Sequence, residues 1–110
     1  MASIVEKIEA AVKENKIMIF MKGNRSFPQC GFSAATVAIF DEIGAPYATA
    51  DVLSDPELRD AIKQYSNWPT IPQVYIDGKF VGGCDIIREL HETGELEPMV
   101  KAAVGASAQQ

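Results

Sequence analysis

The sequence lacks an excess of positive charge and any long hydrophobic run. Ten Lys and Arg residues face fifteen Asp and Glu residues, which gives a net charge of -5. Because a nucleic-acid phosphate backbone requires a basic surface, this balance argues against general nucleic-acid binding. No apolar run approaches the roughly 20 residues that span a bilayer, and the N-terminus resembles neither a signal peptide nor an Arg-rich transit peptide. We therefore expect a soluble cytoplasmic protein without nucleic-acid or membrane partners; an organelle matrix is the alternative if a targeting peptide has been removed.

Cysteine is scarce as well, which excludes two further classes of protein. Cys30 and Cys84 are the only cysteines and stand far apart in the chain. They are too few for a secreted disulfide scaffold and are not spaced like zinc ligands, so a reducing compartment fits best.

A length of 110 residues suits one domain, and 47% hydrophobic with 23% charged residues is typical of a folded globular protein. We expect one domain over residues 1–104 and a flexible tail over residues 105–110.

The pattern of apolar residues predicts helices and strands in alternation. Ser3 and Glu6 have the spacing of a capping box, and apolar residues follow them at helical intervals. Asp77-Gly78 joins two short apolar runs and is a strong hairpin signal. The expected order is a helix ending near Asn15, a buried strand at 16–21, a helix that stops at Gly44, a strand at 46–53, a helix at 54–65, a hairpin around 77–78, a helix from Asp85 to Gly94 and a short helix at 95–104.

This order predicts an α/β fold with a small mixed sheet flanked by helices. In such folds the ligand crevice lies outside the carboxyl ends of the parallel strands, and Cys30 follows the first strand closely. A thiol at a helix N-terminus, with Lys22 near it, can have a pKa of roughly 3.5 to 7.5 instead of about 8.5. The alternative is that Cys30 is simply a small buried hydrophobic residue, as a lone cysteine usually is.

Four short motifs stand in order along the chain: FMKG at residues 20–23, CGFS at 30–33, NWPTIPQ at 67–73 and GGCDI at 82–86. Together, and at compatible spacing, they resemble one family, the monothiol glutaredoxins of the thioredoxin-like fold. The resemblance covers residues 4–104 and is strongest to the short, single-domain members. It implies a four-stranded sheet and a site for glutathione.

The resemblance assigns the two ends of a glutathione site to different segments. Lys22 and Arg59 would bind the glycyl carboxylate, although Arg59 could equally be a solvated helix residue. The backbone of Ile71 would pair with the cysteinyl part, and we expect a cis peptide bond at Pro72. Phe32 would wall the site.

The GGCDI motif would supply the remaining contacts. Free amides at Cys84 and Asp85 would hold the γ-glutamyl carboxylate, and the Asp85 side chain would take the ammonium, with helix capping as its alternative role. Cys84 could resolve a Cys30 disulfide only if their Cα atoms lie within about 7 Å, and we prefer a backbone role for it. Trp68 could be a wall or simply core, and we expect His91 to be an exposed helix residue.

The number of sulfur atoms decides between the possible functions. Ser33 cannot attack a mixed disulfide as a second cysteine would, whereas a 2Fe-2S cluster usually needs four sulfur ligands. Together with the family's behaviour, this count implies a homodimer in which two Cys30 thiolates and two glutathiones share one cluster, for delivery to recipient apoproteins. BolA-like proteins are further partners that the resemblance implies.

Two other functions stay open. One is a glutathione-dependent thiol-disulfide oxidoreductase, in which Cys30 removes glutathione from proteins, with at most weak activity. The other is an inert module whose cysteines are buried.

Overall fold

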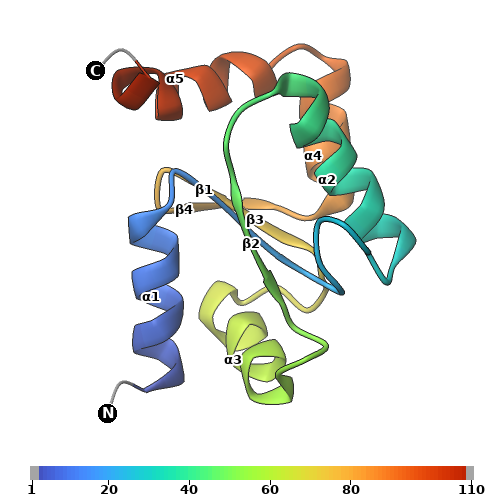
Figure 1. The fold of residues 1–110 in the computed structure, drawn as a ribbon, viewed down its shortest axis with the longest axis vertical. Coiled ribbons are helices and arrows are strands. Elements are labelled where there is room, and N and C mark those ends of the chain that lie inside the picture. The colour runs from blue at the N-terminus through green and yellow to red at the C-terminus, as the bar shows by residue number, and fades with distance from the viewer. Residues whose placement is uncertain (1–2, 109–110) are drawn as a thin grey trace.

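The computed structural model describes residues 3–108, which form nine elements around one sheet (Figure 1). The order agrees with the sequence prediction. The elements are α1 (Ile4–Glu14), β1 (Ile17–Met21), α2 (Gly31–Ile43), β2 (Ala48–Asp51), α3 (Pro56–Ser66), β3 (Gln73–Ile76), β4 (Lys79–Gly82), α4 (Cys84–Glu92) and α5 (Leu96–Ala108).

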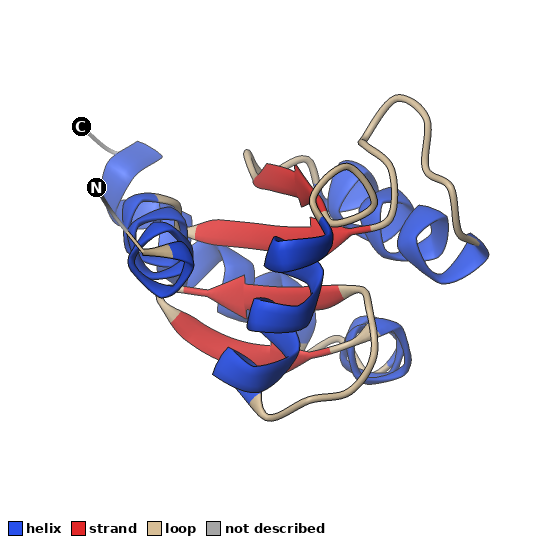
Figure 2. Cartoon of the chain, turned by 90° about the horizontal axis from the view of Figure 1, so that it is seen from below, coloured by secondary structure: helices blue, strands red, loops and turns tan. Residues whose placement is uncertain are grey.

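The four strands form a mixed sheet in the order β2-β1-β3-β4, and Figure 2 shows them side by side. β1 pairs in parallel with β2 and antiparallel with β3. β3 and β4 form the predicted hairpin, in which Asp77 and Gly78 have φ angles of 53° and 79°. Positive φ at both central turn residues is typical of a type I′ turn, which explains the Asp-Gly pair. The predicted α/β fold, with a small four-stranded mixed sheet flanked by helices, is confirmed.

Each face of the sheet packs against its own group of helices. Side chains alternate along a strand, so Ile17, Ile19 and Met21 of β1 enter one core cluster while Met18 and Phe20 enter the other. The first cluster lies against α2, α4 and α5, and the second against α1 and α3 (Figure 1). β1 is therefore buried along its whole length, as its continuous apolar run predicted.

Local signals place most of the helix ends. The capping box of Ser3 and Glu6 is present, and α2 ends at Gly44, which has a φ angle of 84°. α3 begins after Asp55, whose side chain accepts a hydrogen bond from the Leu58 amide. These ends depend on neighbours in the chain, which is why the sequence predicted them.

Several element boundaries differ from the prediction, including β2, which is shorter than the strand expected at 46–53; two of the helix boundaries have a clear cause. α4 begins at Cys84 instead of Asp85, because the extended backbone of Gly83 makes it the N-cap and its carbonyl accepts from the Ile87 amide at 3.0 Å. α5 continues past the expected end at Val104 to Ala108, since its alanines favour a helix. Residues 109 and 110 of the predicted tail lie outside the described residues. Within residues 3–108, no helix combines the length and hydrophobicity needed to cross a membrane.

Candidate functional site

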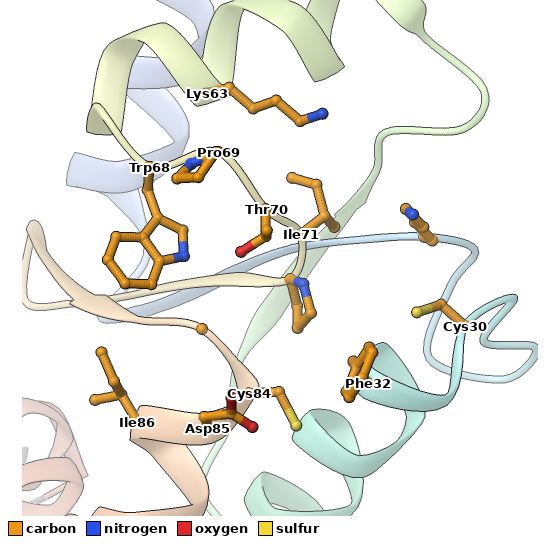
Figure 3. Close-up of a pocket in the computed structure, with 13 residues that line it drawn as sticks. Cys30, Phe32, Lys63, Trp68, Pro69, Thr70, Ile71, Cys84, Asp85 and Ile86 are labelled. Atoms are coloured by element: carbon orange, nitrogen blue, oxygen red, sulfur yellow. The ribbon is translucent and has the colours of Figure 1, made fainter.

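A cavity of about 500 Å³ opens at the carboxyl end of β1 (Figure 3). Three segments that are distant in the sequence form its walls: the start of α2, the segment between α3 and β3, and the start of α4. Seven of the eight residues predicted for the site line it, namely Lys22, Cys30, Phe32, Ile71, Pro72, Cys84 and Asp85. Further residues line it as well: Lys63, Trp68, Pro69, Thr70, Gly83 and Ile86.

Cys30 is the N-cap of α2 and is half-buried, with an extended backbone. The pKa of its thiol lies below the ordinary value, chiefly because the backbone N–H of Ser33 stabilises the thiolate. Partial burial opposes this effect, while the Phe32 amide and the positive charge of Lys22 add to it. Exposure and a stabilised thiolate are the conditions under which a cysteine can act as a nucleophile or a sulfur ligand.

Ser33 is fully buried and has a structural role that its sequence position did not reveal. Its hydroxyl accepts a hydrogen bond from the Lys22 amide at 3.1 Å, which joins the end of β1 to the first turn of α2. The hydroxyl also makes a small contribution to the lowered pKa of the Cys30 thiol. Ser33 therefore positions Cys30, although it cannot resolve a disulfide.

The loop from Lys22 to Cys30 is tied at its base. The Gly23 amide donates to Asp51 at 2.9 Å, and the Gln29 amide donates to the Lys22 carbonyl at 2.9 Å. Gly23 has a φ angle of 84°, and a Cβ there would lie 2.7 Å from the Gln29 nitrogen and closer still to the Phe27 carbonyl oxygen. Only glycine fits a left-handed backbone with so little space.

The second wall is held by a buried glutamine. Gln73 donates from its side-chain amide to the carbonyls of Trp68 and Thr70, at 3.1 and 3.3 Å. This holds the segment that leads to Ile71 and Pro72, whose peptide bond is cis as expected. The indole nitrogen of Trp68 is buried beside Gly83 without a hydrogen-bond partner among the described residues.

The third wall carries the second thiol and the acidic residue. Cys84 is buried, with only 6% of its surface exposed, and its sulfur lies 3.5 Å from Arg88 Nη2. Both cysteines are free thiols. Asp85 is exposed at the second position of α4, and no side chain caps this helix, so the alternative role of Asp85 as a cap is wrong.

The cations near the cavity differ from the expected pair. Lys22 and Lys63 line it, but Arg59 does not. Arg59 lies on α3 one turn before Lys63, where its Nε is 3.9 Å from Asp60 Oδ1. The spacing of four residues could have indicated Lys63, since both residues share one face of the helix.

The side chain of His91 is paired with a carboxylate. Its Nε2 lies 3.2 Å from Glu42 Oε2, and 30% of its side chain is exposed, so it is more buried than expected. Among residues 3–108 no three His, Cys, Asp or Glu side chains gather as a metal site would require. Cys30 can therefore contribute one metal ligand, and the described chain offers no cluster of others.

Comparison with known proteins connects this geometry to a family. The glutaredoxin family model matches residues 17–81. A relative from Synechocystis sp., an uncharacterized monothiol glutaredoxin, is 53% identical over 91% of this chain and 94% of its own length. This chain belongs to the monothiol glutaredoxins.

Solved glutaredoxin structures share its fold. The solution structure of reduced poplar apo GrxS14 superposes with a TM-score of 0.82, at 43% identity over 93% of this chain and 94% of that one. The crystal structure of a buckwheat glutaredoxin-glutathione complex superposes with a TM-score of 0.81, at 30% identity over 91% and 89% of the two chains. The buckwheat glutaredoxin binds glutathione in that crystal structure.

Proposed function

We propose that this glutaredoxin binds a 2Fe-2S cluster as cargo and delivers it to recipient apoproteins in iron-sulfur protein biogenesis. Cys30 is the only ligand that the chain provides, and glutathione bound in the cavity provides the next one. Two such subunits complete the usual set of four sulfur ligands. The cluster-bound form is therefore a homodimer.

One observation carries this proposal: the reactive thiol stands alone. Cys30 is accessible and its pKa is lowered, whereas Cys84 is buried and the residue where a second active-site cysteine would stand is the buried Ser33. No group of three potential ligands surrounds Cys30 in the part of the chain that is described. A cluster held here needs ligands from outside the polypeptide.

The charges of the cavity suit glutathione as the external ligand. Lys22 and Lys63 bring two positive charges and Asp85 brings one negative charge. Glutathione carries two carboxylates and one ammonium, so its charges are the complement of these three. The backbone near Ile71 lies between Lys63 and Asp85 (Figure 3), where the cysteinyl part would pair, and Pro72 and Phe32 also line the cavity. The Cys84 and Asp85 amides at the start of α4 receive the γ-glutamyl carboxylate.

Anaerobic reconstitution with iron, sulfide and glutathione tests the cluster. We expect a coloured dimer that contains two irons per two chains and depends on glutathione. Cys84→Ser is the matched control and should behave like the wild type, whereas Cys30→Ser should stay colourless and monomeric. A coloured Cys30→Ser protein, or a cluster that forms without glutathione, would contradict the proposal.

The binding of glutathione is measured separately, by calorimetry on the protein without iron. Lys63→Met should weaken binding by roughly tenfold, because one charge-assisted hydrogen bond is lost. Arg59→Met serves as the comparison on the same helix face. If Arg59→Met weakens binding as much as Lys63→Met, Arg59 also reaches the glycyl carboxylate, as the resemblance implies; if neither substitution matters, the carboxylate binds elsewhere.

A BolA-like protein is a further proposed partner, which would replace one subunit of the dimer. Adding it to the cluster-bound protein should change both the visible spectrum and the size of the assembly. Unchanged values for both would remove this partner from the proposal.

The second candidate function is thiol-disulfide exchange, and the lowered pKa of Cys30 favours it. Cys30 would attack a protein-glutathione mixed disulfide, and free glutathione would then resolve the product. We expect weak turnover, because Ser33 provides no second thiol. Rapid turnover with glutathionylated proteins would make this the main activity.

A further inference from the structure

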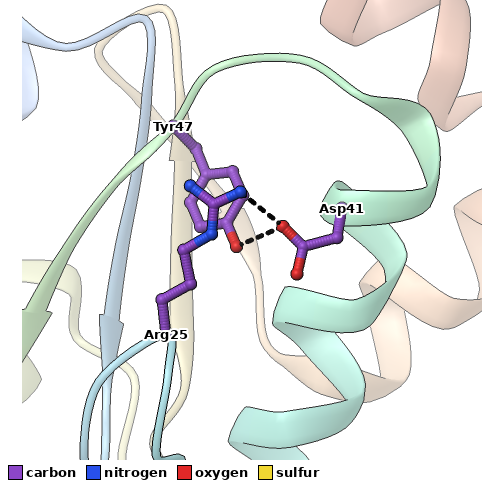
Figure 4. Close-up of polar contacts among 3 residues, drawn as sticks. All are labelled: Arg25, Asp41 and Tyr47. Atoms are coloured by element: carbon purple, nitrogen blue, oxygen red, sulfur yellow. Dashed lines mark hydrogen bonds and ion pairs between the residues drawn. The ribbon is translucent and has the colours of Figure 1, made fainter.

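The side chains of Arg25, Asp41 and Tyr47 form a cluster that we name the Arg25 cluster (Figure 4). It connects the loop of residues 22–30, the Cys30 loop, to the body of the protein. Arg25 Nη2 lies 2.9 Å from Asp41 Oδ1, and the Tyr47 hydroxyl donates to the same oxygen at 2.7 Å. The guanidinium of Arg25 also stacks over the Tyr47 ring, with Cζ 4.4 Å from the ring centroid. Arg25 comes from the loop, Asp41 from α2, and Tyr47 from the segment that leads to β2.

Two contacts hold the guanidinium group of Arg25, one with Asp41 and one with the Tyr47 ring. Burial and the hydrogen bond to Asp41 raise the pKa of Tyr47 to about 12, so the hydroxyl stays a donor at neutral pH. Asp41 is thereby oriented, and its carboxylate faces the guanidinium. The ion pair and the cation-π contact act on Arg25 together.

Arg25 is the side chain that fastens the tip of the loop. The tip, residues 24–27, is closed on itself, because Asn24 Oδ1 accepts from the amides of Ser26 and Phe27 at 2.9 and 2.8 Å. The base of the loop is tied separately, through Gly23 and Gln29. Within residues 3–108, Arg25 makes the only side-chain hydrogen bond or ion pair between this tip and a helix or strand.

Two exposed aromatic residues flank Cys30 in the chain. Phe27, at the end of the tip, is 71% exposed, and Phe32, which borders the cavity, is 57% exposed. Two such rings gain free energy when they bury each other. A released tip could achieve this by folding toward Phe32, and it would then narrow the approach to the thiol that lies between them in the chain.

We propose that Arg25 is a positioning residue, which keeps the loop tip away from the cavity so that a protein-sized thiol partner can reach Cys30. Small thiol reagents need little space and reach the sulfur in either position of the tip. Bulky partners need the tip held back against α2. The Arg25 cluster thus sets which sizes of partner react, and it leaves the chemistry of the thiol unchanged.

The test compares two reagents that share one reactive group. N-Ethylmaleimide and a maleimide carried on a polyethylene glycol chain are reacted with the iron-free protein, and labelling of Cys30 is followed by mass spectrometry. Arg25→Ala should slow the polymer reagent about fivefold and change the rate of the small reagent by less than about twofold. Arg25→Lys should give an intermediate rate, since it keeps the charge but loses the planar stacking.

A second substitution identifies Phe27 as the covering group. Phe27→Ala in the Arg25→Ala background should restore the rate of the polymer reagent, because no ring remains to pack on Phe32. Lys16→Ala is the matched control, since it breaks an exposed ion pair of 3.5 Å with Asp77 at a distance from the cavity, and it should change neither rate. Thermal unfolding of each variant verifies that it is folded.

Three results would overturn the proposal: no loss of the polymer rate in Arg25→Ala, an equal loss with both reagents, or no recovery in the double variant. The measurement uses neither iron nor glutathione. Failure of the proposed cluster function would therefore leave this result unaffected, and the two can be judged separately.

Discussion

Cys30 and Cys84 line the same cavity, and each stands at the start of a helix, yet only one has the properties of a reactive thiol. Cys30 is the half-buried N-cap of α2, and its pKa is lowered by the Ser33 and Phe32 amides and by Lys22. Cys84 is the first residue of α4, is buried and faces Arg88. A helix N-terminus is thus not sufficient for reactivity. Accessibility makes the difference, since Cys84 is buried even though Arg88 Nη2 lies 3.5 Å from its sulfur.

The two thiols also differ in how their segments are held. The Cys30 loop is fixed by backbone hydrogen bonds through Gly23, Gln29 and Ser33, so its position depends on polar contacts. Cys84 is held by burial beside the apolar core, in which the nearby Ile87 is fully buried. Substitutions on the Cys30 side should therefore change reactivity and stability together, whereas those near Cys84 should change little.

Replacing each cysteine in turn by serine gives the largest expected difference in labelling. Cys30→Ser should abolish labelling of the native protein by iodoacetamide at neutral pH, because Cys84 is buried. Cys84→Ser should label at a rate within about twofold of the wild type. Mass spectrometry of the intact protein measures both. If Cys84 is labelled rapidly in native Cys30→Ser, the contrast between the two thiols is wrong.

Loosening the Cys30 loop gives the next largest effect. Gly23→Ala should lower the free energy of unfolding by about 2 to 3 kcal/mol, because it adds a close contact with the loop backbone to an unfavourable φ angle. Gly44→Ala is the matched control, since Gly44 has the same φ of 84° and no neighbour within 4 Å. It should cost about 1 kcal/mol. Equal losses in urea unfolding would show that space at Gly23 does not matter.

Removing the Ser33 hydroxyl should have a moderate effect on both the stability of the protein and the reactivity of Cys30. Ser33→Ala leaves the Lys22 amide without its partner and should cost about 1 to 2 kcal/mol of unfolding free energy. It should also raise the pKa of Cys30 toward its ordinary value. A lowered pKa keeps the thiolate populated down to a lower pH, so the rate-pH profile of alkylation should shift to higher pH and the rate at neutral pH should fall about threefold.

Thr36→Val is the control for the Ser33 substitution. Thr36 is also fully buried on α2, but its hydroxyl donates to the Phe32 carbonyl at 2.9 Å and does not face Cys30. We expect an unchanged rate-pH profile for this variant. A shift as large as that of Ser33→Ala would mean that any loss of a buried hydroxyl in this helix moves the thiol.

The smallest effect is expected on the Cys84 side. Arg88→Gln removes the 3.5 Å contact to the Cys84 sulfur and should change the free energy of unfolding by less than about 0.5 kcal/mol. Cys84 should stay unlabelled in the native protein, because burial and not Arg88 protects it. Rapid labelling of Cys84 in this variant would show that the arginine is the barrier.

Much of the fold could be predicted because its signals are local. The capping box at Ser3, the stop at Gly44 and the turn at Asp77-Gly78 each depend on residues that are neighbours in the chain, and the structure confirms all three. The end of α5 could not be placed in this way. The expected end at Val104 was wrong, because the alanines near it favour continuation of the helix to Ala108.

The candidate site was predictable in part, through the four motifs. They correctly brought Lys22, Cys30, Ile71 and Asp85 to one cavity. They did not separate Arg59 from Lys63, because both share one face of α3 and only the folded position of the helix decides which of its turns lies at the cavity. The buried role of Ser33 was missed for a similar reason, since its partner, the Lys22 amide, belongs to another element.

The sequence alone determined the order of the elements and the presence of one thiol at the start of a helix, because both depend on short-range propensities and spacing. Only the tertiary structure decided that Cys30 is accessible and Cys84 is buried, that Lys63 lines the cavity, and that Arg25 reaches Asp41 and Tyr47. The physical reason is that burial, charge proximity and hydrogen bonding arise between segments that the chain brings together only when it folds.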